Sequence, residues 1–417
     1  MLKSTPIGPI GLDPAELFAP VAESETIGLA VSGGADSLAL MLLYTAWCEP
    51  KPKAIVYTVD HQLRPESRAE AAMVVAAAKR AGLTCRSLVW SGVKPSTGKQ
   101  SAARQARYGL IAQAMAEDGV QLLVTAHHQR DQAETFLMRL AHGSGVSGLA
   151  GIRQFSNFAG ITMFRPLLGV SVQELETLVE SAGLSPAQDP SNTNPAYERT
   201  RWRNALVGLS ELGLSPKRLV KAAERLKRVD EFAANATNDF IVGNVHLDHL
   251  GIVRIESEAI RRADPEIRVR VIDRMLAVVS GKQSFFLSRI EALAERIGAG
   301  ANFTTTLGGA RVLVEGPAVF LHREAGRAGL PSANLGIGDQ ILWDGRFTVS
   351  AAAAGSIAPA TNFTRAAFER LTGSPFVGPI AGLRAAPLVR DHSGEIVAIG
   401  ALQIAKGFSV MPIPLTS

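Results

Sequence analysis

Cysteine is scarce in this chain of 417 residues, which contains only Cys48 and Cys85. The pair forms no C-x-x-C spacing, so neither a disulfide framework nor a cysteine-based metal site is indicated. Both cysteines lie in apolar stretches. We therefore expect both to be small core residues of a protein in a reducing compartment.

Long apolar runs are also missing, since no stretch approaches the roughly 18 apolar residues that a membrane helix needs. The first twenty residues have no uninterrupted apolar region behind a basic start, which argues against a secretory signal. These two absences predict a soluble, cytoplasmic protein without a membrane partner. The formal charge of +5 is a small excess for such a length and gives an anionic partner only a mild preference.

Short β-branched runs alternate with helical spacing in the first half, which predicts βαβ units and an α/β fold with a parallel sheet covered by helices. Ligands of such sheets bind at the carboxyl ends of the strands. We place this catalytic domain at residues 1–212. The expected strands lie at residues 26–33, 54–63, 84–90, 121–128 and 162–168.

The pattern changes beyond residue 212. Apolar residues recur every three or four positions in residues 216–234, 264–279 and 284–299, which predicts a mostly helical middle domain over 213–328. Residues 323–338 are rich in glycine and are the best linker candidate. Strand-like pieces follow, so we expect a small α+β domain over 329–417.

A glycine-rich turn follows the first expected strand. Adjacent glycines let backbone N–H groups approach a phosphate, and the following helix adds its positive N-terminal dipole. The lysine of the usual P-loop is absent, and Asp36 stands in the turn instead, where a carboxylate beside phosphates requires a cation such as Mg²⁺. A plain strand-helix turn with Asp36 and Ser37 as caps is the alternative. The turn comprises Ser32, Gly33, Gly34, Ala35, Asp36 and Ser37.

This turn resembles the SGGxDS motif of the PP-loop ATP-pyrophosphatases, whose fold is adenine nucleotide alpha hydrolase-like. The resemblance implies that residues 32–37 bind ATP, that Asp36 holds Mg²⁺, and that ATP is cleaved between its α and β phosphates to adenylate a carbonyl oxygen.

Further segments are similar to the lysidine synthases within that family. The matching segments are residues 59–64 (VDHQLR), 103–108 (ARQARY) and 125–135 (TAHHQRDQAET). The resemblance implies ATP contacts for His61, Arg107 and Gly143, a tRNA contact for Arg104, and a place near the adenylate for His127.

Asp131 and Glu134 follow His127 at spacings of four and seven residues, so the three share one polar stripe wherever this segment is helical. The resemblance implies that both carboxylates bind a lysine substrate and act with Asp36 and His127 in catalysis. The alternative is that Asp131 is a helix N-terminal charge and Glu134 a surface residue.

A basic cluster follows residues 189–192 (DPSN). By resemblance, Arg199, Arg201 and Arg203 serve ATP and the anticodon arm of tRNA, although such a cluster is often a solvated surface. The same resemblance assigns tRNA binding to the C-terminal domain. Three positions depart from the family pattern: Gln100, Arg130 and His142.

The resemblance implies an ATP-dependent ligase. It would join L-lysine to carbon 2 of the wobble cytidine of an isoleucine tRNA with a CAU anticodon, through an adenylated cytidine, and release AMP and pyrophosphate. The oligomeric state stays open, with a homodimer among the alternatives.

Other activities remain to be weighed. A tRNA thiolase of the same fold would need a sulfur carrier or a catalytic cysteine pair, and neither Cys48 nor Cys85 lies in a site motif. Small-molecule amidotransferases would lack the arginine cluster. A non-catalytic ATP sensor would bind nucleotide without releasing pyrophosphate.

Overall fold

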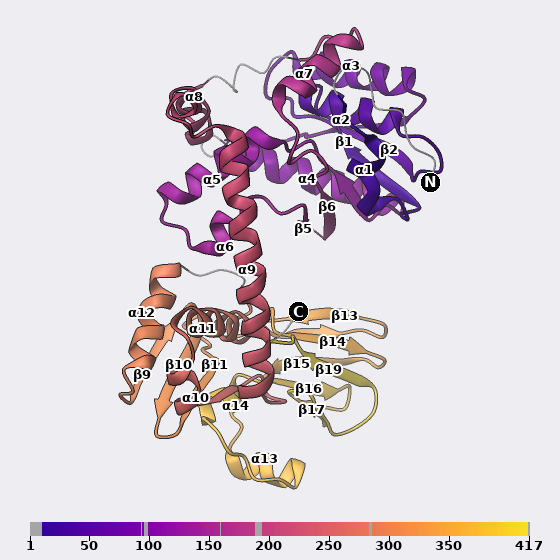
Figure 1. Cartoon of the computed structure of the whole chain (residues 1–417). Coiled ribbons are helices and arrows are strands. Elements are labelled where there is room, and N and C mark those ends of the chain that lie inside the picture. The colour runs from indigo at the N-terminus through magenta and orange to yellow at the C-terminus, as the bar shows by residue number, and fades with distance from the viewer. Residues whose placement is uncertain are drawn as a thin grey trace. The chain divides into compact units, whose positions relative to one another are not determined.

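A computed structural model describes residues 11–92, 94–95, 99–158, 160–187, 194–282 and 286–415. The chain divides into two compact units, Met1–Val229 and Asp230–Ser417, which are described separately (Figure 1). The predicted domain limits at 212/213 and 328/329 stay predictions. No helix among the described residues is long and apolar enough to cross a membrane.

The first unit is built on a six-stranded sheet of order β3-β2-β1-β4-β6-β5. Its strands are parallel except β5, which pairs antiparallel with β6. The predicted parallel sheet is thus confirmed, with an added edge strand that the sequence did not predict. The strands are β1 (Thr26–Ala30), β2 (Lys53–Asp60), β3 (Thr84–Val89), β4 (Leu122–Val124), β5 (Phe155–Phe158) and β6 (Ile161–Phe164).

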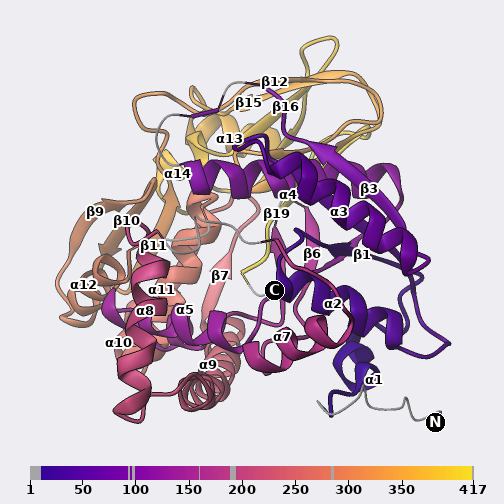
Figure 2. The ribbon, with the colours of Figure 1, turned by 90° about the horizontal axis from the view of Figure 1, so that it is seen from above.

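Helices connect these strands and cover both faces of the sheet. Helix α2 packs against α7 on one face, where the two lie side by side (Figure 2), while α4 covers Tyr57 and Leu123 on the other face. The helices of this unit are α1 (Pro14–Phe18), the 3-10 turn η2 (Ala19–Val21), α2 (Ala35–Ala46), α3 (Ser67–Arg80), α4 (Lys99–Glu117), α5 (Gln129–Ala141), α6 (Val146–Leu149), α7 (Val172–Ser181) and α8 (Glu198–Glu211). Helix α9 (Pro216–Asn244) begins in this unit, and its residues from Asp230 onward belong to the second unit.

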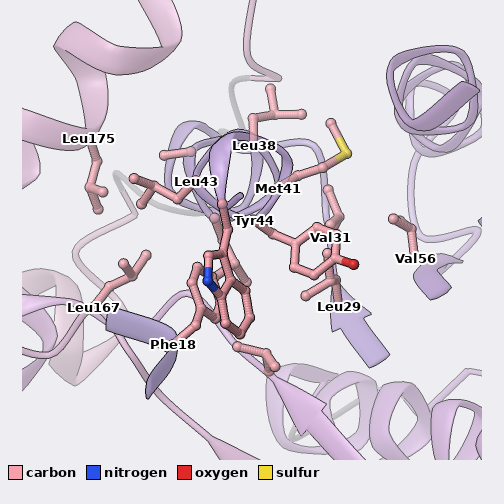
Figure 3. Close-up of a cluster of buried hydrophobic side chains, with 14 of the residues drawn as sticks. Phe18, Leu29, Val31, Leu38, Met41, Leu43, Tyr44, Val56, Leu167 and Leu175 are labelled. Atoms are coloured by element: carbon pink, nitrogen blue, oxygen red, sulfur yellow. The ribbon is translucent and has the colours of Figure 1, made fainter. Parts of the chain in front are cut away.

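The main core of this unit lies between β1 and helix α2. Alternate residues of β1, such as Leu29, pack against Leu38 and Met41 of the helix, and Phe18 stacks on Trp47 with ring centroids 5.2 Å apart (Figure 3). These side chains are almost wholly buried. Their burial fixes the start of α2, and therefore the glycine-rich turn, against the end of β1.

The strand order reverses between β1 and β4. From β1 the chain moves outward to β2 and β3, and α4 then carries it back across the sheet to β4 on the other side of β1. In open α/β sheets the crevice at such a switch point, outside the carboxyl ends of the strands, binds the ligand. The turns that follow β1 and β4 carry two of the predicted site motifs, the glycine-rich turn and residues 125–135.

The described residues of the second unit form three antiparallel sheets. One has the order β7-β8-β11-β10-β9 and packs against α11, another the order β12-β15-β16-β17-β18, and the third the order β13-β14-β19. The segment that the sequence predicts to be mostly helical therefore also carries a five-stranded sheet.

The strands of this unit are β7 (Val245–Leu247), β8 (Val253–Glu256), β9 (Phe303–Leu307), β10 (Ala310–Glu315), β11 (Ala318–Arg323), β12 (Ala333–Leu335), β13 (Gln340–Trp343), β14 (Phe347–Ala351), β15 (Gly355–Pro359), β16 (Pro387–Asp391), β17 (Ile396–Ile399), β18 (Leu402–Gln403) and β19 (Phe408–Pro412). Its helices are α10 (Ser257–Arg262), α11 (Pro265–Ser280), α12 (Leu287–Gly298), α13 (Arg365–Thr372) and α14 (Ile380–Arg384).

The two cysteines differ from expectation in one respect. Cys85 lies in β3 and is half-buried, and burial raises the pKa of its thiol to about 11. Cys48 is exposed, so its prediction as a core residue is wrong. The reason is local, because α2 ends at Ala46 and leaves Cys48 beyond the apolar face of the helix.

Candidate active site

A cavity of about 380 Å³ lies at the carboxyl ends of β1, β2 and β4. Its size falls within the range of small-molecule sites. It brings together most of the site residues that the sequence predicts. Those among its lining residues are Ser32, Gly34, Asp36, Ser37, His61, Arg104, Arg107, His127, Asp131 and Arg199.

The glycine-rich turn is held from within. The Ser37 hydroxyl donates to the Gly34 carbonyl at 2.9 Å and accepts the Ser32 N–H at 3.1 Å. Gly33 has a φ of +89°, a conformation that L side chains rarely adopt, and a Cβ there would lie 3.1 Å from the Met73 methyl carbon. The turn therefore needs glycine at position 33 for its backbone and serine at position 37 for its closure.

The N-terminus of α2 is open. Gly34 is the N-cap and, among the described residues, no side chain caps the helix, so its first N–H groups are available to a ligand. A Cβ added at Gly34 would meet no atom within 4 Å. A helix start with unused N–H groups and a positive dipole end is suited to bind phosphate.

Asp36 lies in the first turn of α2 and lines the cavity with 40% of its side chain exposed. No cluster of three or more metal-binding side chains occurs in the described part of the chain. A single carboxylate fits Mg²⁺ nonetheless, because this ion commonly uses one or two carboxylates together with substrate phosphates. Asp36 therefore suits a magnesium ion that arrives with a nucleotide.

His127 follows β4 and lines the same cavity. Its Nδ1 atom lies 2.9 Å from the Thr125 hydroxyl. Burial lowers the pKa of His127 to about 4, opposed by Asp131 and assisted by Arg165, Arg104 and Arg199. The imidazole is therefore neutral at pH 7 and can accept a proton or donate one hydrogen bond.

Asp131 and Glu134 lie on one face of α5, as the spacing predicts, and both bind the same arginine. Arg199 of α8 donates from Nη2 to Asp131 Oδ1 at 2.8 Å and from Nε to Glu134 Oε2 at 2.6 Å. Arg203 donates from Nε to Glu134 Oε1 at 2.7 Å. The predicted amino-acid site thus already contacts a cation.

The two carboxylates differ in their access to the cavity. Asp131 lines it, whereas Glu134 is 0% exposed and is not among the lining residues that the structure describes. Burial would raise the pKa of Asp131, but His128, Arg199 and His127, together with the N–H of residue 128, lower it overall. Asp131 is therefore the carboxylate that faces a ligand, with Glu134 behind it.

The predicted tRNA-binding arginines separate into two groups. Arg199 and Arg203 are turned inward onto Glu134, whereas Arg201 is exposed and donates to the carbonyls of Pro195 and Ala196. Arg104 lies over the Tyr108 ring, with 5.0 Å between its guanidinium carbon and the ring centroid.

Three ATP-binding residues outside the glycine-rich turn are predicted by resemblance to the lysidine synthases. Two of them, His61 and Arg107, face each other, and Arg107 Nε donates to His61 Nε2 at 3.2 Å. Gly143 is not brought to the cavity described here. It follows the C-terminal end of α5, a helix of 13 residues and therefore about 20 Å long, at the far end from Asp131.

The departures from the family pattern also have contacts. Arg130 Nε lies 3.9 Å from Glu134 Oε1 and adds a third arginine around that carboxylate. His142 Nε2 lies 2.9 Å from Glu198 Oε1. The side chain of Gln100 and residues 189–192 lie outside the described residues.

Two residues at this site were not predicted from the sequence to be site residues. His128 is 1% exposed and its Nε2 lies 3.3 Å from Asp36 Oδ2. Arg165 is 6% exposed, donates to the Arg153 carbonyl at 2.8 Å, and contributes positive charge near His127. The double histidine was visible in the sequence, but only the fold shows which of the two faces Asp36.

Comparisons with known proteins agree with this geometry. The model of a family described as the PP-loop domain matches residues 13–209. A tRNA(Ile)-lysidine synthase of Bradyrhizobium sp. is 41% identical over 307 residues, which cover 69% of this chain and 84% of that protein. The chain belongs to the tRNA(Ile)-lysidine synthase family.

Other members of the lysidine synthase family match a larger part of the chain. The enzyme of Ruegeria pomeroyi is 34% identical over 387 residues, which cover 88% of this chain and 90% of that protein. Among solved structures, a U34-tRNA thiolase from Methanococcus maripaludis has a TM-score of 0.44 at 18% identity and covers 52% of this chain and 78% of that chain. The predicted family is confirmed, and the relatives favour it over the thiolase alternative.

Proposed function

We propose that the protein ligates L-lysine to carbon 2 of the wobble cytidine in an isoleucine tRNA with a CAU anticodon, consuming ATP and releasing AMP and pyrophosphate. The observation that carries this proposal is the cavity at the switch point, where the open end of α2 and the acidic turn of α5 line the same space. The names of the relatives support the same activity.

In this proposal the triphosphate lies against the N–H groups at the start of α2. Arg107 and Arg104 would supply positive charge, since both line the cavity. Asp36 would hold Mg²⁺, which neutralises phosphate charge when bound. Fixed donors and cations that face the developing charge are the usual source of rate in such reactions.

The first chemical step activates the base. The carbonyl oxygen on carbon 2 of cytidine bonds to the α-phosphorus of ATP, and the bond to the β-phosphate oxygen breaks so that pyrophosphate leaves with that electron pair. The base then carries AMP on its oxygen.

In the second step an amine of lysine bonds to carbon 2 and the carbon-oxygen bond breaks, releasing AMP. The amine must lose a proton, and His127, which lines the cavity as a neutral imidazole, would accept it.

The acidic pair supports an amino-acid substrate. Arg199 already places a guanidinium against both Asp131 and Glu134, so the pair accommodates a positively charged group. We place the ammonium of lysine that does not react at this position, with Arg199 turning toward the phosphates when lysine enters. Asp131 would contact the ammonium directly, and Glu134 would offset part of the positive charge of the arginines around it.

For tRNA, Arg201 is the predicted residue best exposed to a long polyanion. Exposed basic residues of α9 would also bind tRNA phosphates, since phosphates pair with exposed cations. RNA would contact Arg104, Arg199 and Arg203 only where it enters the cavity. The exposed basic residues of α9 are Lys217, Arg218, Lys221, Arg225, Lys227 and Arg228. A tRNA-binding C-terminal domain, a cytoplasmic location and a homodimer stay predictions.

The direct test mixes the purified protein with ATP, labelled lysine and an isoleucine tRNA transcript that carries CAU, and measures label in the RNA. A transcript with cytidine 34 replaced by uridine is the matched control. Label in the first RNA alone, with equimolar AMP and pyrophosphate, is the expected result, and the absence of label overturns the proposal.

The same assay separates the alternatives. Replacement of Cys48 and Cys85 together by alanine should leave lysine incorporation intact, and its loss in a folded variant would revive the thiolase alternative. A non-catalytic ATP sensor would bind ATP and release no pyrophosphate even with tRNA and lysine present.

A further inference from the structure

The starting observation is the residue type at the N-terminus of α5. His128 is the N-cap of this helix, where its Nδ1 accepts the Arg130 N–H at 3.2 Å, while Asp131 Oδ2 accepts the N–H of His128 at 3.0 Å. Asparagine, aspartate and serine are the preferred residues for this task. Capping alone therefore does not explain a histidine here.

The hydrogen bonds assign the tautomer of His128. A ring nitrogen that accepts an N–H carries no proton, so the neutral ring has its hydrogen on Nε2. Nε2 lies 3.3 Å from Asp36 Oδ2 and 3.7 Å from Asp131 Oδ2. The donor of a fully buried side chain thus faces the carboxylate of Asp36, on the helix that follows the neighbouring strand.

Asp36 depends on this contact for its orientation. Within the part of the chain that the structure describes, its carboxylate has no other ion pair or side-chain hydrogen bond. Asp36 is 40% exposed, and a partly exposed carboxylate without a fixed partner samples several rotamers. His128, at 1% exposure, is the more rigid of the two.

We propose that His128 is a positioning residue that spans the switch point between β1 and β4 and orients the Asp36 carboxylate toward the nucleotide cavity. Its Nδ1 atom caps the start of α5 and its Nε2 atom contacts Asp36, so one ring joins the phosphate-binding helix α2 to the acidic helix α5. The inference rests on the proposed function for the nucleotide and its accompanying cation, and adds a residue to that site.

Three substitutions separate positioning from capping. His128→Asn keeps an N-cap acceptor but is too short to reach Asp36, whereas His128→Gln places an amide donor near the former Nε2 position and loses the cap. Ser171→Ala is the matched control, because Ser171 caps α7 with the same reciprocal bonds and does not line the cavity.

The readouts are the melting temperature and the Kd for ATP in the presence of Mg²⁺, measured by calorimetry without lysine or tRNA. His128→Asn should melt near the wild-type temperature and bind ATP about tenfold more weakly, as expected for the loss of one close contact to a charged group. His128→Gln should melt a few degrees lower, roughly the effect of a lost cap, yet recover part of the affinity. Ser171→Ala should melt lower with unchanged affinity.

A double-mutant cycle completes the test. If His128 acts through Asp36, the variant with both His128→Asn and Asp36→Asn should bind ATP no more weakly than Asp36→Asn alone, because neighbours in one network are not additive. Additive losses, or an unchanged Kd in a folded His128→Asn protein, would overturn the inference. Failure of the wild-type protein to bind ATP would instead count against the proposed function.

Discussion

Two helix N-termini lie at the same edge of the first unit's sheet, and only one of them is capped by a side chain among the described residues. Helix α2 begins at Gly34 with no side-chain cap, whereas α5 begins with reciprocal bonds between His128 and the turn that contains Asp131. An uncapped start leaves N–H groups for a ligand, and a capped start uses them internally. The comparison assigns phosphate binding to α2 and the placement of side chains to α5.

The carboxylates near these two helix starts also differ in the charges that surround them. Asp36 at the α2 end is partly exposed and lies against His128, whereas Glu134 in α5 is fully buried among Arg199, Arg203 and Arg130. The first arrangement leaves a carboxylate for an incoming cation. The second needs its own cations, because a buried charge without a partner is costly.

The largest effect is expected at the α2 end. Asp36→Ala should abolish pyrophosphate formation, a loss of at least about 100-fold, because the Mg²⁺ that offsets the phosphate charge would lose its protein ligand. The fold should survive, since Asp36 is partly exposed. Pyrophosphate release and circular dichroism measure the two outcomes. Glu176→Ala on α7, an exposed acidic residue, is the control, and unchanged turnover in Asp36→Ala would remove Asp36 from the site.

At the α5 end we expect a different signature. Glu134→Ala should raise the KM for lysine more than that for ATP, because the acidic site loses half its charge. The substitution should also cost about 2 kcal/mol of stability, since Arg199 and Arg203 lose their buried partner. Steady-state kinetics and urea unfolding measure these effects. A lysine KM equal to that of the wild type would exclude Glu134 from amino-acid binding.

The glycines of the turn offer a matched pair. Gly34→Ala should weaken ATP binding about tenfold with unchanged stability, because a methyl group there meets no protein atom and the position lines the cavity. Gly33→Ala should cost about 1–2 kcal/mol of stability, since its φ is +89°. Calorimetric titration and thermal unfolding distinguish them. Equal losses of affinity and stability in both variants would contradict the separate roles of Gly34 in ATP binding and Gly33 in the backbone conformation.

The smallest effect concerns pH. The pKa of His127 is lowered from 6.5 to about 4, so between these values the unfolded chain binds more protons and stability falls as the pH falls. His127→Gln should remove that part of the slope, so its stability should change less between pH 6.5 and 4.5 than that of the wild type. Urea unfolding at both values measures it, with exposed His392→Gln as the control. An identical slope in His127→Gln would contradict the buried, neutral imidazole.

Local patterns predicted much of the sheet and of the site. The β-branched runs place β1, β2, β3, β4 and β6, and the glycine pair marks the turn before α2. Edge strand β5 was missed because its four residues, FSNF, are too few to show a period. The exposed position of Cys48 was missed because it depends on where α2 ends.

Contacts between distant segments could not be predicted in this way. Glu134 pairs with arginines 65 and 69 residues later in the chain, and no periodicity within α5 indicates that pairing. The contact of His128 with Asp36 likewise arises only because β4 lies beside β1. Sequence motifs therefore supplied the residues of the site, and the fold determined which of them face a ligand.

A crystal structure with a non-hydrolysable ATP analogue and Mg²⁺ tests the division of labour between the two helix ends most directly. The account predicts phosphate oxygens within hydrogen-bonding distance of backbone N–H groups in residues 33–37, with the Asp36 carboxylate beside the ion. Phosphates bound at the start of α5, or anywhere away from residues 32–37, would contradict it.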